Sequence, residues 1–198
     1  MAPPLLLASS SPYRRALLSR LGIPFIWASP DVDETPLVST NGAPGEPAPA
    51  LAERLAHAKA RALVEDYPGH WIVGADQVAV LDGNRTLGKP GDMARAQAQL
   101  RAASGRQLQF ITALCLVNGE RTLSASDTVV VQFRDLQDTE IIRYLEAEQP
   151  WDCAGSFKCE GLGISLFESI HSSDPTSLEG LPLIALCQLL REAGYRIP

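Results

Sequence analysis

The sequence predicts an α/β protein with a long mixed sheet and flanking helices. Strand-like and helix-like segments alternate over the first half of the chain, a long β-hairpin occupies the middle, and an apolar helix pattern ends it. Alternation indicates parallel strands with helical crossovers, whereas a hairpin adds antiparallel strands. Together the two patterns predict a mixed sheet, in two lobes around a cleft.

Length and composition favour one globular domain over residues 1–198. The chain is 45% hydrophobic and 20% charged, which is enough to bury a full core. Its net charge of −6 argues against a nucleic-acid partner held by general phosphate attraction. No run approaches the roughly 20 apolar residues of a membrane span. We therefore expect a cytoplasmic protein without a membrane or nucleic-acid partner, with its four cysteines reduced.

The first elements follow from short-range patterns. The opening stretch "LLLASSSPYRRALLSRLG" predicts a buried strand, then a helix that starts at Pro12 and ends at Gly22. A second helix is expected over about residues 49–66. One apolar stripe is predicted for it: Leu51, Leu55, Ala58 and Ala62. "HWIVGADQVAVLDG" is interpreted as a buried strand, a polar interruption and a second strand.

The later elements have clearer end signals. An Ala-rich helix over residues 91–104 is closed by Gly105. Asn118-Gly119 between two β-rich runs predicts a hairpin. A helix is expected over about residues 138–148, a strand over "GLGISLFESI", and a final helix over "LPLIALCQLLREAG".

The opening stretch also suggests a site for an anion. Ser11 is a good N-cap and Pro12 a good first helical residue, and a helix N-terminus attracts phosphate. Arg14 and Arg15 oppose the helix dipole there, which favours a binding role over a solvated surface. A capped helix with arginines in solvent is the alternative. Motifs for a phosphate loop, a dinucleotide fold or a histidine-based triad are absent from the sequence.

Two acidic segments are candidates for chemistry. Asp31, Asp33 and Glu34 cluster in "DVDETP", which suits Mg²⁺ or a plain solvated loop equally. Asp76 follows the buried run "WIVGA" and is expected at the carboxyl end of a strand, where open α/β sheets bind ligands. A turn aspartate is the alternative for Asp76.

Lysines and glycines supply weaker signals. Lys59 lies on the flank of its helix stripe and could simply extend to solvent, and Lys89 in "LGKPGD" could reach a phosphate. The glycines of "CAGSFKCEGLGISLF", around Lys158 and Glu160, suggest a backbone that approaches something closely, or a plain glycine-rich loop.

In order along nearly the whole chain, these stretches resemble the Maf family of nucleoside triphosphate pyrophosphatases. The matching motifs are the opening stretch, "VDET", "LAHAKA", "GADQV", "LGKP" and "CAGSFKCEG". The resemblance is closest to the 7-methyl-GTP branch, on "DQV", "GSFKCEG" and the ending "DPTSLEGLPLIALCQLLR". It implies a fold like that of the inosine triphosphate pyrophosphatases. It also implies hydrolysis between the α and β phosphates.

The resemblance also implies roles for individual residues. Asp76 would activate water, and Glu34 would act with it through a divalent metal, Mg²⁺ or Mn²⁺, held by both. The residues that would hold the triphosphate are Ser9, Arg14, Arg15, Lys59 and Lys89. Base specificity would fall to Tyr13, Gln77 and Glu160. Tyr13 stands where tryptophan is expected in this branch, and it would stack on the base. Glu160 would accept hydrogen bonds from guanine N1–H and N2–H, and Gln77 would pair with guanine O6.

Other functions remain open from sequence. A dTTP or UTP pyrophosphatase of the same family is the main alternative within the class. A nucleotide-binding regulator of cell division without turnover is another, although Asp76, Glu34 and both lysines are present. A nucleotidyl or phosphoryl transferase would need an acceptor site that the sequence does not reveal. A homodimer is the oligomeric state that family habit suggests.

Overall fold

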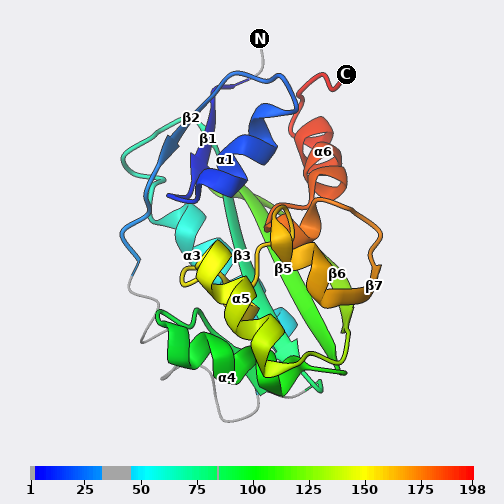
Figure 1. The fold of residues 1–198 in the computed structure, drawn as a ribbon. Helices are drawn as coiled ribbons and strands as arrows, with labels where there is room; N and C mark the ends of the chain where they lie inside the picture. Colours follow the sequence, from blue (N-terminus) through cyan, green and yellow to red (C-terminus); the bar gives the residue numbers. More distant parts are fainter. Residues whose placement is uncertain (1–2, 33–45, 84) are drawn as a thin grey trace. The chain divides into compact units, whose positions relative to one another are not determined.

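The fold is built on one mixed sheet. A computed structural model describes residues 3–32, 46–83 and 85–198. These residues form a seven-stranded sheet in the order β2-β1-β3-β5-β6-β7, with β4 paired to β3 (Figure 1). Pairing is parallel for β1 with β2 and β3, and antiparallel for β3 with β4 and β6 with β7. The mixed α/β sheet predicted from sequence is therefore confirmed.

The element bounds are as follows. The strands are β1 (Leu5–Ala8), β2 (Phe25–Ala28), β3 (Trp71–Leu81), β4 (Arg85–Leu87), β5 (Gln107–Asn118), β6 (Arg121–Phe133) and β7 (Phe167–His171). The α-helices in the described residues are α1 (Pro12–Ser19), α3 (Ala48–Arg61), α4 (Met93–Ala103), α5 (Asp138–Glu148) and α6 (Leu183–Glu192). Short 3₁₀ turns cover Ala154–Ser156, Leu162–Leu166 and Ser177–Glu179.

The chain divides into two compact units. The first contains residues 1–77, 112–127 and 174–198, and the second residues 78–111 and 128–173. Strands β3, β5 and β6 each contribute residues to both units. Of the candidate residues, Lys89 and Glu160 belong to the second unit and the other described ones to the first.

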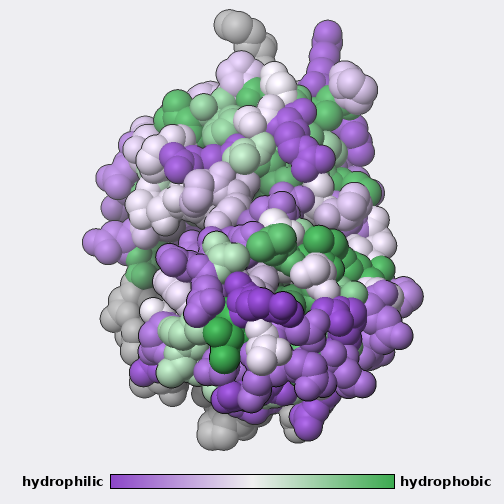
Figure 2. Space-filling view, in the orientation of Figure 1, coloured by the Kyte–Doolittle hydropathy of each residue, from purple (hydrophilic) through white to green (hydrophobic). Residues whose placement is uncertain are grey.

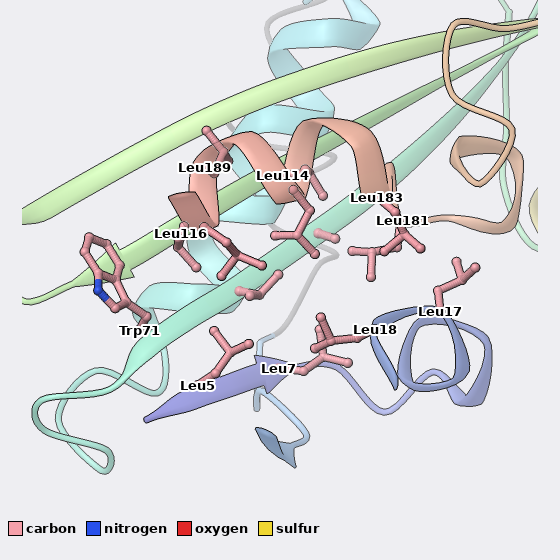
Figure 3. Close-up of a cluster of buried hydrophobic side chains, with 14 of the residues drawn as sticks. Leu5, Leu7, Leu17, Leu18, Trp71, Leu114, Leu116, Leu181, Leu183 and Leu189 are labelled. Atoms are coloured by element: carbon pink, nitrogen blue, oxygen red, sulfur yellow. The ribbon is translucent and has the colours of Figure 1, made fainter. Parts of the chain in front are cut away.

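Aliphatic side chains form the core of the first unit. Figure 3 shows leucines of β1, α1, β5 and α6 pointing toward one another beside Trp71. Buried members include Leu5, Leu7, Leu17, Leu18, Val73, Leu114, Leu116, Leu186 and Leu190. Each fully buried leucine contributes about 1.5–3 kcal/mol relative to an exposed one. This core fixes β1 and α1, and with them the turn between the two elements.

Two expectations for the first unit were wrong. In α3 the buried side chains are Ala52, Leu55, Ala56 and Ala60, so of the predicted stripe only Leu55 is buried. The buried face of α3 lies partly on other positions than predicted, with three alanines beside Leu55, because α3 approaches β3 closely at Gly74. Strand β3 also runs unbroken through Asp76 and Gln77, where an interruption was predicted. Both polar residues have partners there, so the ladder need not break.

The second unit has an aromatic core. Phe110, Phe133, Phe157 and Phe167 meet edge to face, with ring centroids 4.8–5.8 Å apart. The helix predicted over residues 138–148 matches α5, whose N-terminus carries a capping box between Gln137 and Glu140. The strand predicted over residues 161–170 was wrong in its first half, since Leu162–Leu166 forms a 3₁₀ turn before β7.

The face in Figure 2 is mostly hydrophilic, with smaller hydrophobic areas between. Across the described residues, six large hydrophobic side chains are exposed: Ile26, Trp27, Leu162, Ile164, Ile170 and Ile184. None of the helices described is long and apolar enough to cross a bilayer.

Candidate active site

The turn from β1 to α1 is shaped by its own serines. The Ser9 hydroxyl is buried and accepts a hydrogen bond from the Ser11 backbone N–H at 3.1 Å. Ser11 caps α1 by accepting from the Arg14 backbone N–H at 3.4 Å, and Pro12 is the first helical residue. The first turn of α1 contains no acidic residue. No carboxylate in the first turn of α1 therefore neutralises the positive end of the helix dipole, which leaves this end able to attract an anion.

The two arginines of α1 are held by different neighbours. Arg14 Nε donates to the Gly180 carbonyl at 2.8 Å, which ties α1 to the segment before α6. The Arg15 guanidinium lies over the Trp27 ring of β2, 4.1 Å from the ring centroid. A cation over an aromatic face contributes about 0.5–2 kcal/mol. Both guanidiniums are thus oriented by neighbouring groups, and their binding of an anion stays a prediction.

Asp76 and Lys59 form a buried ion pair. Lys59 Nζ lies 2.5 Å from Asp76 Oδ1, and the two side chains are 12% and 10% exposed. The lysine comes from α3 and the aspartate from β3, so the packing of α3 on β3 sets the pair. A buried carboxylate is costly unless it is paired. Because Asp76 lies inside β3, the alternative of a turn aspartate does not apply, and its role in chemistry stays a prediction.

The position of Asp76 differs from the one predicted. It lies in the middle of β3, not at its carboxyl end. The register pairs Leu7 with Val73, and β1 ends one residue later, so Asp76 lies beyond the carboxyl end of its parallel neighbour. That end of β1 is where the turn carrying Ser9 begins. The ligand-binding edge of the parallel strands is still the one that Asp76 occupies.

Gln77 is bound by its amide nitrogen. Its Nε2 donates to the Thr112 hydroxyl at 2.9 Å and to the carbonyls of Ser177 and Leu178 at 3.0 and 3.4 Å. Internal acceptors therefore occupy the donor end of the Gln77 amide in this structure, and the expected pairing of Gln77 with guanine O6 stays a prediction. Thr112 was missed from sequence: a single polar residue in the buried run "FITALCLV" is its only signal.

Lys89 and Glu160 are both exposed residues of the second unit. The glycines around Glu160 allow close approach of the chain to itself. A side chain on Gly163 would clash with the Lys158 backbone, and one on Gly161 would meet the Glu148 carboxylate. The roles of Lys89 and Glu160 toward a nucleotide stay predictions. A hollow of about 510 Å³ in this unit is lined by the Asp82–Arg106 ion pair, among other residues. Neither Lys89 nor Glu160 lines it.

A divalent metal would find few protein ligands here. Glu34 lies outside the described residues, and so does Asp33, whereas Asp31 is exposed. Within the ranges described, no group of three or more His, Cys, Asp or Glu side chains could hold a metal ion. Mg²⁺ commonly takes one or two carboxylates and completes its shell with phosphate oxygens and water. The buried carboxylate of Asp76 therefore fits a metal that binds together with a triphosphate.

The fold and the site define a class of protein. A strand-to-helix turn with oriented guanidiniums, beside a buried carboxylate–ammonium pair, is typical of α/β proteins that bind phosphate groups and act on them.

The chain belongs to the Maf-like protein family, whose model matches residues 4–193. It is 58% identical, over the full length of both chains, to a 7-methyl-GTP pyrophosphatase of Xanthomonas oryzae pv. oryzae. It is 54% identical to proteins of the same name from Pseudomonas aeruginosa and Pseudomonas fluorescens. These matches cover 99% and 98% of this chain and 100% and 99% of those proteins. The family predicted from the sequence motifs is confirmed.

Proposed function

We propose that this chain hydrolyses 7-methyl-GTP to 7-methyl-GMP and pyrophosphate. The observation that carries the proposal is the buried Asp76–Lys59 pair, which lies in the same unit as the phosphate-binding turn. Full-length relatives named for this reaction, at more than half identity, support the choice of substrate.

In the proposed mechanism Asp76 takes a proton from water. The water oxygen then forms a bond to phosphorus, the bond between that phosphorus and the α–β bridging oxygen breaks, and pyrophosphate and the monophosphate separate. A positioned general base is worth about 10²–10⁴-fold in rate. Lys59 balances the charge of Asp76 before substrate arrives and can then turn toward the phosphate charge that develops.

The turn residues hold the triphosphate. Ser9, Arg14 and Arg15 present a hydroxyl and two guanidiniums to phosphate oxygens, and guanidiniums match that geometry in bidentate fashion. A divalent metal held by Asp76 and Glu34 would neutralise phosphate charge when bound. Lys89, Tyr13 and Glu160 are included on family resemblance: the lysine for phosphate, the tyrosine and the carboxylate for the cationic methylated base.

The test is a panel of nucleoside triphosphates with Mg²⁺ and with Mn²⁺, analysed for both products. We expect pyrophosphate and a monophosphate, with 7-methyl-GTP giving the highest kcat/KM. A preference for dTTP or UTP would move the chain to the pyrimidine-specific alternative. Orthophosphate with a nucleoside diphosphate would overturn the mechanism, and tight nucleotide binding without turnover would favour the regulator.

A further inference from the structure

The Gln77 side chain is enclosed by acceptors at its nitrogen end. Two of these are the backbone carbonyls of Ser177 and Leu178, at 3.0 and 3.4 Å from Nε2. Carbonyls can only accept, so the end of the amide that faces them must be the NH₂ group. The side-chain oxygen of Gln77 is therefore directed away from these carbonyls.

Thr112 completes the enclosure. Its hydroxyl donates to the Ser177 carbonyl at 3.2 Å and so has no second proton to offer Gln77. Toward Gln77 it can only accept, at 2.9 Å from Nε2. Thr112 is fully buried, and the Ser177 carbonyl also accepts from the Gly180 backbone N–H at 2.9 Å. The three acceptors are thus fixed by β5 and by the turn before α6, all within the first unit.

We infer that Thr112 is a positioning residue for base recognition, because it locks the amide of Gln77 with only its oxygen available to a ligand. The inference rests on the proposed function. An acceptor oxygen selects a base edge that carries N–H donors, such as guanine N1–H and N2–H, and does not engage O6. A set of acceptors of this kind disfavours the wrong edge strongly, because rotating the amide would leave the Ser177 and Leu178 carbonyls facing the amide oxygen.

The first experiment compares Thr112→Val with Thr112→Ser. Valine keeps the shape and removes the hydroxyl, whereas serine retains it as the rescue variant. We expect Thr112→Val to raise KM for 7-methyl-GTP about tenfold with kcat within about twofold, because uniform binding is lost. Thr112→Ser should recover most of the difference. Thermal unfolding of both variants checks that each is folded.

A substrate without a base separates positioning from general damage. Ribose 5-triphosphate presents the same phosphates, so its kcat/KM should be unchanged in Thr112→Val. An equal loss on both substrates would overturn the inference and assign Thr112 to the core alone.

The polarity of Gln77 is tested with 6-thio-GTP, in which sulfur replaces the O6 acceptor and the N–H donors remain. The loss in kcat/KM caused by Gln77→Leu should be the same on GTP and 6-thio-GTP. A markedly smaller loss on 6-thio-GTP would show that Gln77 donates to O6, against the inference.

A readout without turnover keeps the two proposals apart. In ¹⁵N-labelled protein, the Gln77 side-chain NH₂ signals, identified by their disappearance in Gln77→Leu, should exchange slowly with water. They should exchange faster in Thr112→Val. If the wild-type protein cleaves no nucleotide, the proposed function fails. The NH₂ signals still test whether Thr112 fixes the Gln77 amide, because fast exchange in the wild type would overturn that inference.

Discussion

At the scale of single residues, Asp76 is the clearest sign of function. A carboxylate in the middle of a buried strand lowers stability unless a partner compensates it, and here Lys59 does so at 2.5 Å. Asparagine at this position keeps the size and an acceptor oxygen but cannot take a proton. Asp76→Asn should therefore lower kcat at least about 10²-fold while the protein stays folded, measured by pyrophosphate release and by circular dichroism.

An exposed pair provides the matched control for Asp76. Asp82 pairs with Arg106 at 2.7 Å, and both side chains are at least half exposed. Asp82→Asn makes the same chemical change in a solvated pair and should leave kcat unchanged and stability within about 0.5 kcal/mol. Near-normal kcat in folded Asp76→Asn would return Asp76 to a structural role.

At the scale of elements, Gly74 sets how closely α3 approaches β3. A Cβ at Gly74 would collide with the Ala56 carbonyl and lie 2.9 Å from Ala60 Cβ. Because α3 carries Lys59 and β3 carries Asp76, the same approach sets the ion pair. Gly74→Ala should lower the free energy of unfolding by about 1–3 kcal/mol and also reduce kcat, measured by denaturant unfolding and by turnover.

A second variant on α3 controls for general effects on the helix. Ala50 is exposed, so Ala50→Leu adds a larger side chain without meeting the sheet. Its stability should stay within about 0.5 kcal/mol of the wild type, with kcat unchanged. Unchanged kcat in a destabilised Gly74→Ala protein would show that the approach of the two elements does not control the pair.

At the scale of the whole molecule, the sequence predicted what depends on local pattern. The bounds of α5 and the Asn118-Gly119 hairpin follow from short-range signals and were confirmed. Contacts between distant segments were not readable in this way. The partners of Gln77 at Thr112 and Ser177, and the Arg14 bond to Gly180, join residues 35 to 166 positions apart. Local sequence patterns do not indicate hydrogen bonds between residues that lie so far apart in the chain.

Global stability should depend on pH through the core thiol of Cys115. Its Sγ donates to the Ala56 carbonyl at 3.2 Å, and burial raises the thiol pKa from 9.0 to about 12. Above pH 9 the unfolded chain releases this proton while the folded chain keeps it. The stabilisation is therefore complete below pH 9 and is lost as the pH rises toward 12.

Cys115→Ala isolates this contribution, because every other titrating group is common to both proteins. The variant leaves a small cavity and should be less stable at pH 7. The wild-type advantage should then shrink by about 2 kcal/mol between pH 9 and pH 11, since each pH unit can change it by at most about 1.4 kcal/mol. Denaturant unfolding of both proteins at pH 7, 9, 10 and 11 measures the difference. A constant difference across that range would mean that the thiol titrates alike in the folded and unfolded states, which a buried side chain of β5 in contact with α3 should not do.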